Sequence, residues 1–461
     1  MALFFDQYLT EYDDSLSAES YIDPVGTLII WSAFGRQVFH NRVNSISNDV
    51  RNYTLNLFHH FLVRKLLDDD EATLSVSLRH KYHSKDALPF KQACLIFLEN
   101  IFVYSVLKHE RTEGVQSTGI LGISNARRCW DKTDGDPTLV FTHDPAGQIL
   151  VRQLGLGVSG RYKTPLMEVG FFDGSYQYNK PASQPHWAEA EALIVGNRNS
   201  LLSKVARTAY PFLKESAANL RHGGKLQFRE KVPKELTKAY AHAFASPQTV
   251  GSYARDFWLQ QTGLDGGAAG ALFKVLDASP GDQPGSQQVL EEALLQELQP
   301  TEKAKLEEIA QLEPFLSDCT LLFRLMAAER SHSVTSVAGQ WRQFGRDEYR
   351  LPGLARQIET YANLSAVKGT EAARRLVQLQ QAANAGGLDE QIRALAAYHG
   401  KVMQSRGQLS WLVVEDNDMI KVSARTLARP DPKRWTPGAW YNEYYLPQFT
   451  NFVWGLHGAG T

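Results

Sequence analysis

Residues 91–107 combine helical spacing with apolar side chains around nearly the whole circumference of the helix. Leu95, Phe97 and Ile101 cannot share one narrow stripe, so this helix needs apolar neighbours on most of its sides. This requirement constrains the fold more than any other segment does. We therefore predict that the segment is the core helix of an N-terminal helical domain, residues 1–112.

Helical patterns cover much of the remaining chain. Apolar residues recur at helical spacing within residues 28–62. Residues 290–400 are rich in Ala, Leu, Gln, Glu and Arg, and we expect breaks at Pro314, Pro352 and Gly386–Gly387. A chain of 461 residues is too long for one ordinary core. The sequence therefore predicts a mainly α, multi-domain helical protein.

Short β-structure is expected at two places. Residues 138–142 are β-branched or aromatic and are flanked by turn residues, which predicts a strand. Residues 409–414 and 419–422 are apolar runs on either side of an Asp/Asn turn. They predict a β-hairpin within residues 409–422.

A glycine bend follows the first of these strands. Residues 149–163 run from an apolar segment through a Leu-Gly-Val-Ser turn at 156–159 into Arg161, Tyr162 and Lys163. This is the order of a helix-turn-helix, in which the second helix offers cations to DNA.

A competing interpretation exists for the same residues. Arg152 stands where the first helix usually has a core-facing residue, and Pro165 restricts where the second helix begins. The alternative is a glycine loop whose basic residues are simply solvated. The Gly-x-Gly-x-x-Gly of residues 155–160 does not indicate a dinucleotide site, because no further parallel strand follows. We predict that residues 113–182 form a helix-turn-helix or winged-helix-like module, with a short wing or hairpin at 171–176.

Charge is segregated further along the chain. Residues 204–238 hold nine basic and three acidic residues, whereas residues 265–318 hold eleven acidic residues and three lysines. The basic segment, which also contains aromatic rings, indicates a nucleic-acid surface or an electrostatic partner for acidic residues of this chain or another subunit. We expect a linker at 278–288, which is rich in Pro, Gly, Ser and Gln, between a basic helical region (183–277) and a C-terminal helical domain (289–461).

The candidate nucleic-acid-binding residues come from these segments and from a basic pair ahead of the strand. They are Arg127, Arg128, Arg152, Arg161, Tyr162, Lys163, Lys204, Arg207, Lys214, Arg221, Lys225 and Arg229. Arg127 and Arg128 either extend the same surface or interact with the dipole of their own helix. Because the formal net charge is −1, any contact with a polyanion has to depend on such local patches.

No residue pattern indicates a metal site, a cofactor or a reaction. His59 and His60 are adjacent and point in different directions on a helix, and His80 and His83 are surrounded by basic residues. The sequence lacks the usual metalloprotease, serine-hydrolase and catalytic-cysteine motifs. We expect neither metal nor cofactor. Catalytic groups can still converge from distant positions, so whether the protein is an enzyme stays open, with a non-enzyme favoured.

The sequence favours a cytoplasmic location without a membrane. The three cysteines lie far apart and outside any Cys-x-x-Cys pattern, which fits a reducing compartment. We expect no signal peptide, and the longest apolar run has half the length that a membrane span needs.

These patterns predict a non-catalytic DNA-binding accessory subunit of a bacterial multiprotein DNA-handling system, such as restriction, antiviral phage defence or a mobile element. Its partners would be double-stranded DNA and other protein subunits. The alternative is a structural or adaptor subunit that binds proteins without touching nucleic acid, and a third hypothesis is a cryptic metal-dependent nuclease. The residues do not distinguish DNA from RNA.

Overall fold

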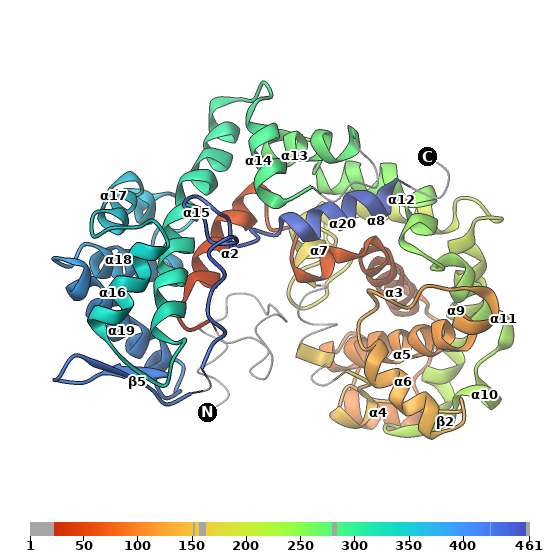
Figure 1. The fold of residues 1–461 in the computed structure, drawn as a ribbon. Helices are drawn as coiled ribbons and strands as arrows, with labels where there is room; N and C mark the ends of the chain where they lie inside the picture. The colour runs from red at the N-terminus through yellow and green to blue at the C-terminus, as the bar shows by residue number, and fades with distance from the viewer. Residues whose placement is uncertain (1–22, 151–152, 156–162, 279–283, 425, 458–461) are drawn as a thin grey trace.

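The computed structural model describes residues 23–150, 153–155, 163–278, 284–424 and 426–457. Most of these residues lie in α-helices, and the strands are few and short. The mainly α class is therefore confirmed. Figure 1 shows two groups of helices, one on each side of the view, that are joined across the top.

The first helical group lies on the right of Figure 1 and contains most elements between residues 45 and 262. Short 3₁₀ turns connect some of its helices. Its elements are η2 (Ser45–Asn48), α3 (Val50–Asp68), α4 (Val76–Tyr82), α5 (Leu88–Glu113), α6 (Ile123–Lys132), η3 (Pro145–Gly147), α7 (Lys163–Val169), η5 (Pro181–Ser183), α8 (Gln184–Val195), α9 (Leu201–Asn219), α10 (Phe228–Lys231), α11 (Lys234–Ala243) and α12 (Pro247–Thr262).

The second helical group lies on the left, and three further helices lie across the top of the view. The second group consists of α2 (Thr27–Val38), α15 (Pro300–Met326), α16 (Val334–Gln343), α17 (Arg350–Gln357), η6 (Tyr361–Asn363), α18 (Glu371–Ala383) and α19 (Leu388–Ser405). The helices across the top are α13 (Gly267–Ala278), α14 (Ser286–Leu294) and α20 (Leu446–Leu456).

The two groups do not follow the order of the chain. α2 packs against α15 and α18, whereas α20, close to the other end of the described chain, packs against α12 and η2. Segments from both ends therefore cross between the groups. The predicted domain boundaries remain predictions. α2 belongs to the predicted N-terminal domain (1–112), but it packs with the helices of the second group.

α5 is the central helix of the first group. Every residue from Phe90 to Leu107 is buried, and the helix ends at Gly114, which adopts the left-handed conformation with φ 69°. α3, α6, α11 and β1 pack around it. The predicted core helix is confirmed. Among the described helices, α5 alone is long and apolar enough to cross a membrane, and its apolar stretch is entirely buried in the protein, which is compatible with a soluble protein.

The strands form two small antiparallel sheets. β1 (Thr138–Phe141) pairs with β2 (Gly224–Gln227), and β5 (Met419–Val422) lies between β3 (Ser331–Ser333) and β4 (Leu412–Val414). The predicted strand at 138–142 and the predicted hairpin are confirmed. We did not expect β2 and β3, because their short polar sequences carry no alternation of apolar residues.

The helix break predicted at Pro314 is wrong. α15 continues through this residue without interruption for 27 residues. An internal proline costs a helix roughly 3 kcal/mol. The neighbouring Leu312, Phe315 and Leu316 are each fully buried, and their burial outweighs this cost. The break at Gly386–Gly387 is confirmed, since α18 ends before it and α19 begins after it.

The predicted linker at 278–288 joins two helices that pack against each other. α13 ends at Ala278, α14 begins at Ser286, and the two are in extensive contact. Residues 279–283 lie outside the described part of the chain.

Glu313 of α15 binds residues 441–444, the segment that leads to α20. Its carboxylate is fully buried and accepts hydrogen bonds from the backbone N–H groups of Tyr441 (2.6 Å) and Asn442 (2.9 Å), and from Asn442 Nδ2 (2.9 Å) and the Tyr444 hydroxyl (2.8 Å). Ser317 donates a further bond. Burial raises the pKa of Glu313, and these donors oppose that shift.

We predict that Glu313→Ala lowers the thermal midpoint by several degrees, because it leaves buried donors without an acceptor at a cost of about 1–3 kcal/mol each. Glu307→Ala, at an exposed position of the same helix, is the control and should leave the midpoint within about 1 °C, as expected for an exposed, weak ion pair. Equal midpoints for the two variants in differential scanning fluorimetry would contradict this role.

Candidate nucleic-acid interface

α9 carries the first part of the basic segment on its exposed face. The side chain of Ser200 caps the helix by accepting a hydrogen bond from Ser203 N (3.1 Å). Leu202, Val205, Ala209 and Leu213 are buried, and α9 packs against α3, α8 and α11. Lys204 and Arg207 are three residues apart on the opposite, exposed face. Both cations therefore point away from the core.

Lys214, one of the predicted interface residues, is held within the protein. Its Nζ lies 2.8 Å from Asp69 Oδ2 and 3.4 Å from Glu71 Oε2, and Tyr210 donates to the same Asp69 oxygen. These hydrogen bonds, from Lys214 first, hold the pKa of Asp69 well below its usual range. Lys214 is therefore already neutralised by carboxylates of the chain.

Arg221 and Lys225 lie where α9 turns into β2. The side chains of β2 alternate between the two faces of the sheet: Leu226 is buried opposite Leu139, and Lys225 is exposed opposite Val140. Arg221 is exposed in the preceding turn. Both side chains therefore reach solvent at the end of α9.

A second concentration of positive charge lies on α10 and α11. Arg229 and Lys234 are exposed, and Lys108, at the end of α5, lies 3.3 Å from Thr237 Oγ1 of α11. Burial first, and then the positive charges of Lys234 and Arg229, lower the pKa of Lys108. The guanidinium of Arg229 is held by the carbonyl of Asp134. The sequence analysis missed Lys108 because it lies on the otherwise apolar helix α5.

Most of the basic segment is not neutralised by acidic residues of the chain. Of its nine basic residues, Lys214 and Lys231 form ion pairs within the described part of the chain, with Asp69, Glu71 and Glu230. None of the ion pairs between described residues joins this segment to residues 265–318. We give the name basic face to the exposed cations of α9, β2 and the turn between them that form no ion pair with a described residue: Lys204, Arg207, Arg221 and Lys225.

Arg127 is tied to a carboxylate, while Arg128 is exposed. The Arg127 guanidinium makes two bonds to Glu110, at 2.7 and 2.9 Å, and one to Ser117 Oγ at 3.0 Å. Arg128 donates a hydrogen bond to Asn125 of its own helix. Both lie in the middle of α6 and not at its C-terminus, so they do not interact with the end of the helix dipole as the alternative required.

The glycine bend contributes little to the described surface. Arg152, Arg161 and Tyr162 lie outside the described residues. Lys163 begins α7, but its Nζ donates to the Gly174 carbonyl at 2.6 Å and lies 5.2 Å from the centre of the Tyr176 ring. Burial lowers the pKa of Lys163. This residue is half-buried against its own chain and does not face outward as predicted.

The predicted wing at 171–176 is also wrong. Residues 163–183 contain no strand. Phe171, Phe172 and Tyr176 are buried instead, and the last two pack against His60 at ring-centre distances of 4.2 and 4.9 Å. The burial of these three aromatic side chains determines the conformation of residues 171–176.

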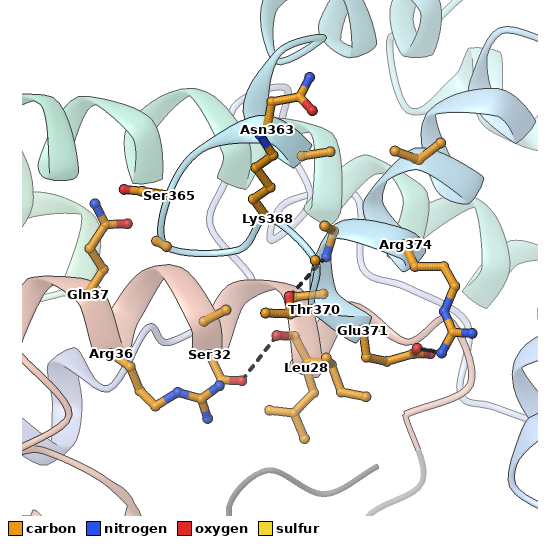
Figure 2. A pocket seen from close by; sticks show the side chains of 18 of the residues that line it. Leu28, Ser32, Arg36, Gln37, Asn363, Ser365, Lys368, Thr370, Glu371 and Arg374 are labelled. Carbon is orange, nitrogen blue, oxygen red and sulfur yellow. Dashed lines mark hydrogen bonds and ion pairs between the residues drawn. The ribbon is translucent and has the colours of Figure 1, made fainter. Parts of the chain in front are cut away.

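A large pocket lies in the second helical group, and none of the predicted interface residues that the structure describes lines it. Its volume is about 1510 Å³, and α2, the loop before α18 and α18 itself form most of its walls. Figure 2 shows Ser32 and Arg36 on α2, and Lys368 and Thr370 on that loop, among the side chains that line the pocket. Glu371 forms ion pairs with Arg374 and Arg375 at one side. The pocket was not foreseen because its walls come from distant parts of the sequence.

Histidines take several different environments. His59 and His60 are buried, and burial lowers the pKa of His59 to about 3. His80 and His83 are exposed, as expected. Within the described residues, His143, Asp144 and His222 form the one group of three metal-ligating side chains that lie close enough to share an ion.

Comparison with known proteins adds no relative: no family model, no curated protein and no solved structure matches the chain.

We predict that Arg127 stabilises the fold in a pH-dependent manner. Its hydrogen bonds lower the pKa of Glu110 from the usual 4.5. A depressed carboxyl pKa stabilises the folded state above the unfolded pKa, and this stability is lost as the pH falls through the folded pKa. Arg127→Ala should therefore cost about 0.5 kcal/mol at pH 7, and the difference from wild type should vanish below the folded pKa of Glu110.

The measurement is the thermal midpoint between pH 7 and pH 3, with Arg128→Ala as the matched control. Arg128 makes no ion pair within the described residues, so its loss should not change the midpoint at any pH. A deficit for Arg127→Ala that is independent of pH would show that the ion pair with Glu110 is not its cause.

Proposed function

We propose that the protein binds nucleic acid, with duplex DNA as the ligand, through the basic face. The observation that carries this proposal is that none of Lys204, Arg207, Arg221 and Lys225 forms an ion pair with another residue in the described ranges. These four side chains lie exposed on α9, on β2 and in the turn between them. Cations that are not neutralised in the folded chain are available to replace the counterions of a phosphate backbone.

The environment of the aromatic rings favours a duplex over a single strand. Binding to single strands generally needs exposed rings on which bases stack. Phe228 and Tyr240 are buried, Phe212 stacks on Phe97, and the Tyr210 ring lies 4.7 Å from Lys65 Nζ. The rings of the basic segment are therefore used inside the protein, while its cations remain outside. This supports contact with phosphates and not stacking on bases.

The wider prediction is a non-catalytic accessory subunit of a bacterial DNA-handling assembly in the cytoplasm, and it forms part of the same proposal. The three cysteines are free, and two of them are buried, which agrees with a reducing compartment. A helix-turn-helix at 149–163 would be an additional DNA contact, through Arg152, Arg161 and Tyr162, but the basic face does not require it. The adaptor alternative predicts no affinity of the isolated protein for DNA.

We predict that Lys204→Ala, Arg207→Ala, Arg221→Ala and Lys225→Ala, combined in one variant, weaken duplex binding at least tenfold at low salt. The slope of log affinity against log salt should fall by about 3–4, because each lost phosphate contact lowers it by about 1. Fluorescence anisotropy with a labelled duplex of mixed sequence, titrated at several salt concentrations, measures both quantities.

The control variant removes the same charge from the second helical group. Arg356, Lys401, Arg429 and Lys433 are exposed there, and their replacement by Ala should leave the affinity within about twofold of wild type. Lys163→Ala should also leave it unchanged, because that side chain faces inward. Equal losses in both quadruple variants would mean that net charge alone drives binding, and no binding by the wild type would favour the adaptor.

A further inference from the structure

The pairing of β1 with β2 brings two histidines together from distant positions in the chain. Phe141 lies opposite Gly224, and the same antiparallel register continued by two residues pairs His143 with His222. Gly223 N donates to the Phe141 carbonyl at 3.0 Å, and His222 N donates to Ser77 Oγ at 3.0 Å. Both histidines are therefore fixed at the same end of this two-stranded sheet.

Asp144 completes the group. Its carboxylate oxygens lie 3.0 Å from His222 Nε2 and 3.5 Å from His143 Nε2. All three ligand atoms lie within 4.8 Å of one another. Neighbouring ligand atoms in a tetrahedral site with bonds of about 2.1 Å are separated by about 3.4 Å, so the observed spacing matches a site for a single ion.

The groups around these three side chains have the arrangement expected of second-shell residues. His143 Nδ1 lies 3.2 Å from the Tyr82 hydroxyl, which leaves Nε2 as the ligand atom. Thr142 Oγ1 lies 3.0 Å from both Asp144 Oδ2 and His222 Nε2, so it orients the carboxylate and contacts the nitrogen that an ion would bind in its place. Tyr82 and Thr142 are both buried. The ligands are therefore held by fixed neighbours and do not hang free on the surface.

The interior of the first helical group holds the loop that carries Asp144. Asn100 Nδ2 of α5 donates to the Gly147 carbonyl at 2.6 Å. A Cβ atom at Gly147 would lie 2.7 Å from the Thr142 carbonyl oxygen, so only glycine allows this close return of the chain. Residues 142–147 are thus held in place by α5 and by a close return of the chain onto itself.

We infer that His143, Asp144 and His222 bind a divalent transition-metal ion of the zinc class. Two imidazole nitrogens and one carboxylate oxygen are a donor set typical of zinc sites that keep an open coordination position. The side chains of His143, Asp144 and His222 are 21, 40 and 23% exposed, so water has access to complete the coordination. This site is independent of the proposed binding of nucleic acid.

Lys81 opposes the binding of a cation at this cluster electrostatically. Its positive charge acts on both His143 and Asp144, but its own side chain is exposed. A solvated lysine can turn away when an ion binds, at a small electrostatic cost. Lys81→Ala should therefore bind the ion at least as tightly as the wild type, and weaker binding by this variant would contradict the electrostatic account.

The test is a titration of the full chain with Zn²⁺ alone, free of nucleic acid, by isothermal calorimetry and by competition with a chromophoric chelator. We expect one ion per chain in the wild type. Tyr82→Phe keeps the buried ring but removes the hydroxyl, and it should weaken binding about 10-fold. Loss of a ligand in His143→Ala or His222→Ala should weaken binding by at least about 100-fold, beyond the usual second-shell effect.

His80→Ala combined with His83→Ala is the matched control, because it removes two exposed histidines that belong to no such group. It should bind Zn²⁺ like the wild type. Circular dichroism and the thermal midpoint in EDTA verify that each variant is folded, and Asp144→Asn provides a variant of nearly the same shape if a histidine variant does not fold. Saturating Zn²⁺ should raise the midpoint of the wild type but not that of the ligand variants.

Two results would overturn the inference. If His143→Ala and His222→Ala bind Zn²⁺ like the wild type, the ion binds elsewhere on the chain. If the folded wild type binds no Zn²⁺, the three side chains form only a hydrogen-bonded cluster that fastens the turn between α9 and β2. Neither result bears on the affinity for DNA, which is measured without metal.

Discussion

The burial of α5 is the constraint on which the first helical group depends. A helix that is apolar on all sides has to be enclosed, and α3, α6, α11 and β1 supply this cover. Its few buried polar side chains then determine where loops can lie: Asn100 bonds to the Gly147 carbonyl, and Glu99 and Asn100 both accept bonds from Gln153. The position of the segment after β1 follows from these contacts, because an unpaired polar group inside this core would be costly.

The same enclosure separates rings from cations in the basic segment. Phe212, Phe228 and Tyr240 turn inward toward α5 and its neighbours, as their contacts with Phe97, Tyr104 and Phe102 show. The lysines and arginines between them are left on the outer side of α9, β2 and α11. The alternation of aromatic and basic residues, which suggests stacking on bases, therefore arises from ordinary amphipathic packing. Only the exposed cations of this segment are available to contact nucleic acid.

The sequence was sufficient wherever a local pattern determines the structure. The helical class, the buried helix at 91–107, the strand at 138–142 and the hairpin at 409–422 all follow from periodicity and turn residues. It failed where contacts between distant segments decide: Pro314 stays within α15 because its neighbours are buried, and Lys163 faces inward because Gly174 and Tyr176 offer it partners. The pocket beside α2 and the pairing of His143 with His222 were not predicted for the same reason.

The register of β1 and β2 links the basic face to the cluster of His143, Asp144 and His222. Side chains alternate along a strand, so a shift of one residue would turn Lys225 toward the interior and Leu226 toward solvent. It would also move His143 away from its position opposite His222. The buried contact of Leu139 with Leu226 opposes such a shift. The pair of Leu139 and Leu226 therefore keeps Lys225 exposed and the two imidazoles together, and His222 follows Arg221 directly in the turn before β2.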